Sequence, residues 1–208
     1  MSVRILCFGD SNTYGYDPRD VLERRYPPQE RWPDLLAAAT GWDVVNLGLN
    51  GRTIPHHPRE AGTALAQICK HLPADCLVIL LGSNDALTMD DASAEKIGAR
   101  MDRFLHTLRG ELPDLPVLLL SPPRVEIPLA HIQELFWELI PVYRKLAAKY
   151  RVSFASPPSW PLPLSADEVH FSAQAHANFA RKIEPLLRQI LSRAGDESGN
   201  PANLREFE

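Results

Sequence analysis

Val3-Arg-Ile-Leu-Cys-Phe8 is a short apolar run that leads directly into Gly9-Asp10-Ser11-Asn12. Similar apolar runs recur along the chain, at residues 43–47, 77–81, 116–120 and 152–155. Several of them are continuously apolar rather than alternating, which is typical of strands that are covered on both faces. Longer segments with apolar residues at helical spacing lie between the runs. This alternation predicts a three-layer α/β domain with a parallel sheet and right-handed crossover connections.

Three helical patterns stand out, because their apolar residues recur every three or four positions and would pack on a sheet. They comprise Ile97, Met101, Phe104 and Leu108; Leu135, Leu139, Val142 and Leu146; and Ala175, Phe179, Ile183, Leu186 and Ile190. Thr88 and Ser172 are expected to cap helix starts, and Gly41 and Gly195 to lie at helix ends. Pro141 and Pro185 fall inside the patterns, so we expect them to kink or split those helices.

The composition is that of an ordinary globular protein, with 208 residues of which 45% are hydrophobic and 23% charged. This length fits a single domain, which we place at 1–195, and a polar tail at 196–208 for which both disorder and docking on a neighbour are open. The net charge of −4 argues against a nucleic-acid partner, because phosphate binding favours a basic surface. The three cysteines match no zinc motif, and no apolar run approaches the roughly 18 residues of a membrane span. We therefore expect a cytoplasmic protein with reduced thiols.

Four polar or glycine-containing clusters follow predicted strands. They are residues 9–12, 48–53, 82–85 and 167–170. In an open parallel sheet the carboxyl ends of the strands share one edge, and ligands bind at this edge. We therefore expect the four clusters to form one site.

The residue types in these clusters suit acyl transfer. The hydroxyl of Ser11 becomes a nucleophile when a base takes its proton, and a histidine such as His170 can act as that base. Asp167 would fix the tautomer of the imidazole and stabilise its charged form. The oxyanion needs donors, for which the Gly51 N–H and the Asn84 side-chain amide are candidates. Asp10 is expected to form a turn rather than to take part in catalysis.

These clusters resemble, in the same order, the four sequence blocks of the SGNH (GDSL) hydrolase family. The matching strings are Gly-Asp-Ser at 9–11, Asn46 to Gly51, Gly-Ser-Asn-Asp at 82–85 and Asp-x-x-His at 167–170. The resemblance implies a flavodoxin-like α/β/α fold with a five-stranded parallel sheet in the order 2-1-3-4-5. It also implies that Ser11, Asp167 and His170 form a catalytic triad. The implied oxyanion hole comprises the N–H groups of Ser11 and Gly51 and the side-chain amide of Asn84.

Longer strings resemble those of bacterial arylesterases and acyltransferases within this family. They are residues 4–16, 31–33, 48–53 and 121–123. This closer resemblance implies cleavage of short acetyl or aryl esters through an acyl-serine, with acyl transfer to an alcohol as a further activity. Carbohydrate acetylesterase and thioesterase activities are the alternatives within the family. One departure is Asn12, which stands where the family name has leucine and for which we expect no chemical role.

The resemblance also bears on cofactors and partners. It implies a small-molecule ester as substrate and no cofactor, and it leaves the oligomeric state open, a homo-oligomer included.

The non-enzymatic alternative is a flavodoxin-like module that binds a nucleotide or a flavin. Residues 9–15 contain neither Gly-Lys-Ser/Thr nor Gly-x-Gly-x-x-Gly, and Asp10 would repel phosphate. An α/β-hydrolase would need Gly-x-Ser-x-Gly, whereas position 13 is threonine.

A few other side chains invite a functional interpretation. We expect no metal site at His56-His57, because adjacent residues rarely face the same way and no third ligand is apparent. A metal set of Asp167, His170 and His176 is equally disfavoured, because His176 falls on the following helix. For Arg52, a contact with substrate and a surface ion pair are both open. Trp32 and Phe179 are expected in the core.

Overall fold

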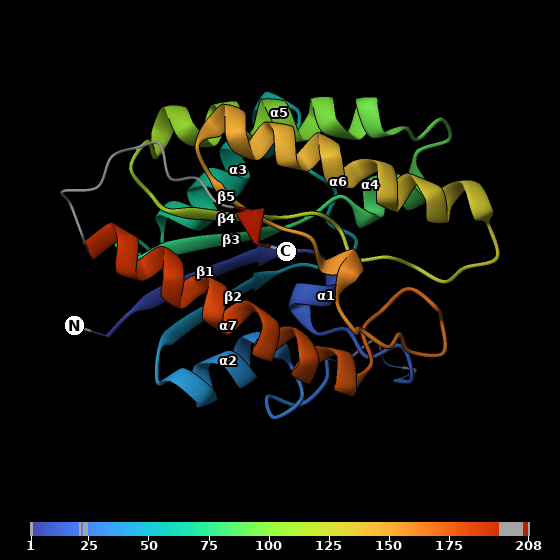
Figure 1. Cartoon of the computed structure of the whole chain (residues 1–208), viewed down its shortest axis with the longest axis horizontal. Helices are drawn as coiled ribbons and strands as arrows, with labels where there is room; N and C mark the ends of the chain where they lie inside the picture. The colour runs from blue at the N-terminus through green and yellow to red at the C-terminus, as the bar shows by residue number, and fades with distance from the viewer. Residues whose placement is uncertain (1, 21, 23–24, 196–205, 208) are drawn as a thin grey trace.

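Six parallel strands form the central sheet of the computed structural model, which describes residues 2–20, 22, 25–195 and 206–207. They are β1 (Arg4–Gly9), β2 (Asp43–Gly48), β3 (Cys76–Leu80), β4 (Val117–Leu120), β5 (Ser153–Ala155) and β6 (Glu206–Phe207). Their order is β2-β1-β3-β4-β5-β6, which confirms the predicted order of the first five strands (Figure 1). The two-residue β6, which pairs with β5, was not predicted. The rest of the polar tail, 196–205 and 208, lies outside the described residues, and the domain boundary at 195 stays a prediction.

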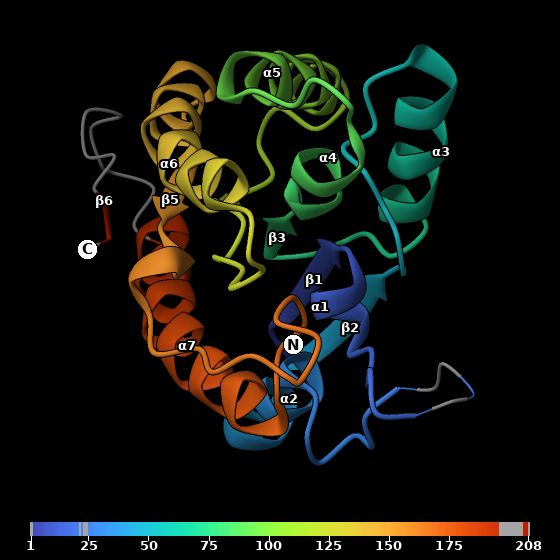
Figure 2. The same cartoon turned by 90° about the vertical axis from the view of Figure 1, so that its right-hand side faces the viewer.

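Helices cover both faces of the sheet (Figures 1 and 2). One face carries α3 (Pro58–Cys69), α4 (Ser83–Thr88), α5 (Ala94–Glu111) and α6 (Ala130–Tyr150), and the other carries α2 (Trp32–Thr40) and α7 (Ala173–Gly195). A hydrophobic core lies on each face of the sheet, and strand β1 contributes to both. Leu6 and Phe8 point to the first face, whereas Ile5 and Cys7 point to the second. All four side chains are fully buried, and burial of a large apolar side chain contributes about 1.5–3 kcal/mol.

The helix ends follow the predicted caps at three positions and differ at one. Gly41 ends α2 with a φ of 71°, Gly195 is the final residue of α7, and the Ser172 hydroxyl accepts the Ala175 N–H at the start of α7. The prediction for Thr88 is wrong, because this residue ends α4 and its hydroxyl donates to the Asn84 carbonyl. The cap of α5 is Ser93, five residues later, whose side chain accepts the Lys96 N–H.

The two internal prolines do not split their helices. Helix α6 continues through Pro141 and α7 through Pro185, and both prolines are exposed. A proline removes one intrahelical hydrogen bond, but the buried residues on either side keep packing on the sheet. Within the described ranges, no helix combines the length and the apolar content needed to cross a bilayer. The expected cytoplasmic location stays a prediction.

The register of the sheet brings the carboxyl ends of three strands together. Gly9 at the end of β1 pairs with Gly48 of β2 on one side and with Leu80 of β3 on the other. The residues that follow these strands therefore begin at the same level of the same edge. The short helix α1 (Ser11–Tyr14) packs on β2 so closely that a Cβ at Gly48 would lie 2.1 Å from the Tyr14 backbone nitrogen.

We expect Gly48→Ala to destabilise the protein by about 3 kcal/mol or more, because backbone atoms cannot move aside as a flexible side chain can. Chemical denaturation followed by circular dichroism measures this loss. The control is Gly62→Ala in α3, where a Cβ would meet no atom within 4 Å. That substitution should stabilise the protein by about 0.5–1 kcal/mol, because alanine is the better helix former. An unchanged denaturation midpoint for Gly48→Ala would contradict the close packing of β2 on α1.

Candidate active site

Ser11 lies just beyond the carboxyl end of β1, at the start of the one-turn helix α1. Asp10 forms the turn, as the sequence predicts, because its Oδ1 accepts the Asn12 N–H at 3.0 Å. Burial raises the pKa of Asp10 to about 6, although the Asn12 N–H and the nearby His170 act in the opposite direction. Gly15 closes the turn with a φ of 88°, a conformation that favours glycine. Ser11 is therefore held on a strand end and a short, buried turn rather than on a loose loop.

His170 and Asp167 lie on the loop between the 3-10 helix η1 (Pro157–Ser159) and α7. Ser11 Oγ is 2.9 Å from His170 Nε2, and His170 Nδ1 is 2.5 Å from Asp167 Oδ2. A tight turn brings the last two side chains together, since Asp167 Oδ1 also accepts the backbone N–H groups of Val169 and His170. The three residues predicted as a triad thus form one chain of hydrogen bonds, although Ser11 and His170 are 159 positions apart.

The electrostatics of the loop keep the carboxylate ionised. Partial burial opposes the ionisation of Asp167, but hydrogen bonds from the His170 ring and from the N–H groups of His170 and Val169 outweigh it and lower the pKa of Asp167. A charged Asp167 can stabilise a positive imidazolium. The Tyr16 ring lies against the imidazole with 4.7 Å between ring centroids. Sequence analysis did not identify Tyr16, because no motif marks an aromatic contact of this kind.

The other two predicted oxyanion donors, Gly51 and Asn84, lie on segments that are hydrogen-bonded to each other. Gly51, after β2, has a φ of 69°, and Asn84 lies in the first turn of α4, after β3. The Asn84 side-chain amide donates to the carbonyl of Arg52 at 3.0 Å. The buried Asp85 accepts the Ile54 N–H at 2.9 Å, so the loop after β2 is fastened to α4 at two points. An amide nitrogen has two hydrogens, so the bond to Arg52 leaves one for another acceptor.

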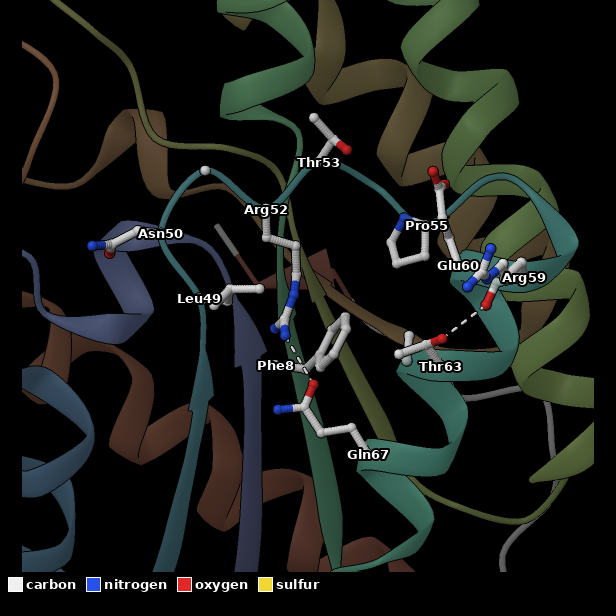
Figure 3. Close-up of a pocket in the computed structure, with 12 residues that line it drawn as sticks. Phe8, Leu49, Asn50, Arg52, Thr53, Pro55, Arg59, Glu60, Thr63 and Gln67 are labelled. Atoms are coloured by element: carbon white, nitrogen blue, oxygen red, sulfur yellow. Dashed lines mark hydrogen bonds between the residues drawn. The ribbon is translucent and has the colours of Figure 1, made fainter.

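Arg52 hydrogen-bonds within the protein instead of forming the surface ion pair that was one of its two alternatives, and a contact with substrate stays a prediction. Its guanidinium turns inward and donates to the carbonyls of Gly9 (3.0 Å) and Leu47 (2.5 Å). It also donates to Gln67 Oε1 at 2.8 Å (Figure 3). It also lies 4.1 Å from the centroid of the Phe8 ring. Burial lowers the pKa of Arg52 to about 10, and the nearby Asp10 opposes this shift. Arg52 therefore joins the ends of β1 and β2, and through its own carbonyl it also holds Asn84.

A cavity of about 400 Å³ adjoins this loop (Figure 3). The loop residues from Leu49 to Thr53 form one wall and α3 forms another, with Thr63 and Gln67. The Phe8 ring and Arg52 lie between these walls. The cavity shares Gly51 with the predicted oxyanion hole, whereas Ser11 and His170 are not among its lining residues.

His56, His57 and His176, which were considered as metal ligands, form no hydrogen bond with the triad residues within the described part of the chain. The His56 and His57 rings lie against each other in a tilted arrangement with centroids 4.1 Å apart, and His56 Nδ1 lies 3.0 Å from the Ile54 carbonyl. His176 is fully buried in α7, where Nδ1 accepts the Trp32 N–H. In the part of the chain that the structure describes, no three His, Cys, Asp or Glu side chains lie close enough to hold a metal ion. Trp32 and Phe179 pack together in the core, as predicted.

His176 is expected to make the fold sensitive to acid. Burial, together with the charge of Arg31, lowers the pKa of His176 to about 3. Below about pH 6.5, His176 is protonated in the unfolded chain. In the folded protein its imidazole stays neutral down to about pH 3. The free energy of unfolding should therefore fall by about 1.4 kcal/mol for each pH unit of acidification within this window.

The variant His176→Asn isolates this contribution, because an asparagine oxygen can still accept a backbone N–H and all other titrating groups remain. The difference in unfolding free energy between wild type and variant should shrink steadily from pH 6 to pH 4 in urea titrations. Parallel stability curves for the two proteins would show that residue 176 does not carry the effect.

Comparisons with known proteins agree with this geometry. Residues 7–177 match the model of the GDSL-like lipase/acylhydrolase family. A carbohydrate acetylesterase family member from Sinorhizobium meliloti has 28% identity and a TM-score of 0.79, over 91% of this chain and 99% of that one. The native aryl esterase of M. smegmatis has 27% identity and a TM-score of 0.78, over 91% and 100%. A search of the curated proteins found no match. The chain therefore belongs to the GDSL-like lipase/acylhydrolase family and is an esterase of the SGNH type.

Proposed function

We propose that this protein cleaves short-chain acetyl and aryl esters through a covalent acyl-Ser11 intermediate. The observation that carries the proposal is the hydrogen-bonded chain from Ser11 Oγ through His170 to Asp167, at 2.9 and 2.5 Å. A hydroxyl and an imidazole at this distance can exchange a proton as the hydroxyl attacks a carbonyl.

In the first half of the reaction, Ser11 Oγ attacks the ester carbonyl carbon and its proton passes to His170 Nε2. The tetrahedral intermediate collapses as the bond to the alkoxy or aryloxy group breaks, and His170 gives its proton to that leaving oxygen. In the second half, a water molecule attacks the acyl-serine and His170 takes its proton. Collapse releases the carboxylic acid and returns the proton to Ser11. An alcohol in place of water gives a new ester, which is acyl transfer.

The negative charge on the carbonyl oxygen needs donors while the tetrahedral intermediate exists. We assign this role to the N–H groups of Ser11 and Gly51 and to the second side-chain hydrogen of Asn84. The assignment is supported by the sheet register, which starts the loops after β1, β2 and β3 at one level, and by the bond from Asn84 to Arg52. Donors held in place before the reaction stabilise developing charge without reorganisation.

Substrate choice depends on the size of the acyl group and on the nature of the alcohol. The aryl esterase and the carbohydrate acetylesterase family member are named for two different alcohols. A panel of esters that varies the acyl length and the alcohol separately distinguishes these substrates from each other and from thioesters.

The decisive experiment treats the protein with a serine-reactive alkyl phosphonate and maps the adduct by mass spectrometry. We expect stoichiometric labelling of Ser11, competition by short-chain esters, and no labelling of the Ser11→Ala variant. Labelling at another serine, or none in a protein that cleaves esters, would overturn the proposed intermediate.

A further inference from the structure

Asn12, the residue after the nucleophile, reaches across to the loop that carries the base. Its side chain is 3% exposed, and its Oδ1 accepts the Phe171 N–H at 2.9 Å. The two residues are 159 positions apart, so this bond joins distant segments and is not part of a local turn. Phe171 directly follows His170, so the bond lies one peptide unit from the predicted base.

Asn12 is itself held firmly. Its backbone N–H donates to Asp10 Oδ1 at 3.0 Å, and its carbonyl accepts the Trp32 indole N–H at 3.1 Å. Trp32 is fully buried in the core between the sheet and α7. The acceptor oxygen of Asn12 is therefore tied to the same turn that places Ser11.

His170 is held from both sides. On its N-terminal side, its own N–H donates to Asp167 Oδ1 at 3.0 Å. On its C-terminal side, the Phe171 N–H donates to Asn12, and the Phe171 ring is fully buried against Phe179. Asp167 orients the imidazole within its own loop, whereas Asn12 connects that loop to the nucleophile. Within the described residues, the Asn12–Phe171 bond and the Ser11–His170 bond are the two hydrogen bonds that join α1 to residues 167–171.

We infer that Asn12 is a positioning residue that sets the distance between the base and the nucleophile. The inference rests on the proposed function, since it assumes that His170 takes the Ser11 proton. Leucine, which the family name has at this position, cannot accept a hydrogen bond. Asn12→Leu therefore removes the link and leaves a buried N–H without an acceptor. The loop is then free to shift, and a displacement of about 1 Å at a reacting group can cost about 10²-fold in rate.

The test is a double-mutant cycle with Asn12→Leu, His170→Ala and the double variant, measured with a p-nitrophenyl acetate assay. We expect Asn12→Leu to lower kcat about 10- to 100-fold and to leave KM within about threefold, because the binding surface remains. In the His170→Ala background the same substitution should cost less than about threefold, because its effect passes through the histidine. Equal losses in the two backgrounds, or full kcat in Asn12→Leu, would overturn the inference.

Two further variants separate positioning from general stability. Asn178→Leu is the matched control, because the Asn178 side chain also bonds to the backbone of the loop before α7, although it donates its amide N–H to the Pro161 carbonyl. It should lower the melting temperature without the loss in kcat. Asn12→Ala repeats the test with a smaller side chain where leucine prevents folding, and the same expected losses apply.

Phosphonate labelling distinguishes failure of this inference from failure of the proposed function. Slow labelling of Ser11 in Asn12→Leu, against rapid labelling of the wild type, supports the positioning role. Equally rapid labelling of both proteins contradicts that role and leaves the acyl-serine mechanism standing. Absence of labelling in the wild type contradicts the mechanism itself.

Discussion

Replacement of His170 by alanine is expected to lower kcat by about 10⁶-fold, the loss seen when a serine hydrolase loses its base. The physical reason is that the Ser11 hydroxyl keeps its proton when no acceptor lies within hydrogen-bond reach. In the structure that acceptor is His170 Nε2, at 2.9 Å from Ser11 Oγ. Because the substrate does not need the imidazole in order to bind, KM should change much less than kcat.

Stopped assays over hours, with the Ser11→Ala protein as the background, measure a loss of this size. The control is His106→Ala, which removes an exposed histidine on α5 and should retain full activity. Near-normal activity in His170→Ala would mean that another group activates the nucleophile. A similar loss in His106→Ala would mean that the assay reports folding rather than chemistry.

Asp167→Asn is expected to lower kcat by about 10⁴-fold while the protein stays folded. Asp167 Oδ2 lies 2.5 Å from His170 Nδ1, so the carboxylate holds a proton on Nδ1 and leaves Nε2 free to accept one. An asparagine amide can donate to Nδ1 instead, which favours the wrong tautomer, and it brings no charge to stabilise the imidazolium. Its oxygen can still accept the N–H groups that Asp167 Oδ1 now binds, so the turn should persist.

The matched control for this variant is Glu168→Gln, which removes the same charge from the next residue, an exposed one. Activity of Glu168→Gln within about twofold of the wild type would show that the local charge alone is not the cause. The expected order of losses is His170→Ala, then Asp167→Asn, with Glu168→Gln close to unity. Comparable activity of Asp167→Asn and the wild type would remove Asp167 from the mechanism.

The strands and the edge that carries the site could be predicted from sequence for a simple physical reason. A strand segment that is covered on both faces is apolar at successive positions, so residues 5–8 of β1 and all of β3 appear as unbroken apolar runs. The bounds of the first five strands agree with the predicted runs to within one residue. Because parallel strands end at one edge, the polar residues after each run could be assigned to one site.

The contacts that fasten this site could not be predicted. Arg52 was left between a substrate contact and a surface ion pair, whereas its partners are carbonyls at the ends of β1 and β2 and the side chain of Gln67. Asn12 was assigned no role, because its partner Phe171 is distant in sequence. Carbonyl and N–H partners leave no mark on a sequence, since every residue except proline carries both.

The error at Thr88 has a related cause. The polar segment between β3 and α5 holds both Thr88 and Ser93, and either hydroxyl can cap a helix. The choice depends on where the short helix α4 ends, and α4 is fixed by its contacts with the loop after β2 through Asp85. Local preference could not decide between the two residues.

The 159 positions that separate Ser11 from His170 imply a delay during synthesis of the chain. At about 5–20 residues per second, the ribosome adds His170 roughly 10–30 s after Ser11. During this interval the nascent chain contains Ser11 but lacks the imidazole that is proposed to activate its hydroxyl. Under the proposed mechanism, hydrolysis therefore cannot begin until translation has supplied nearly all of the α/β layers, and incomplete chains are expected to be inactive.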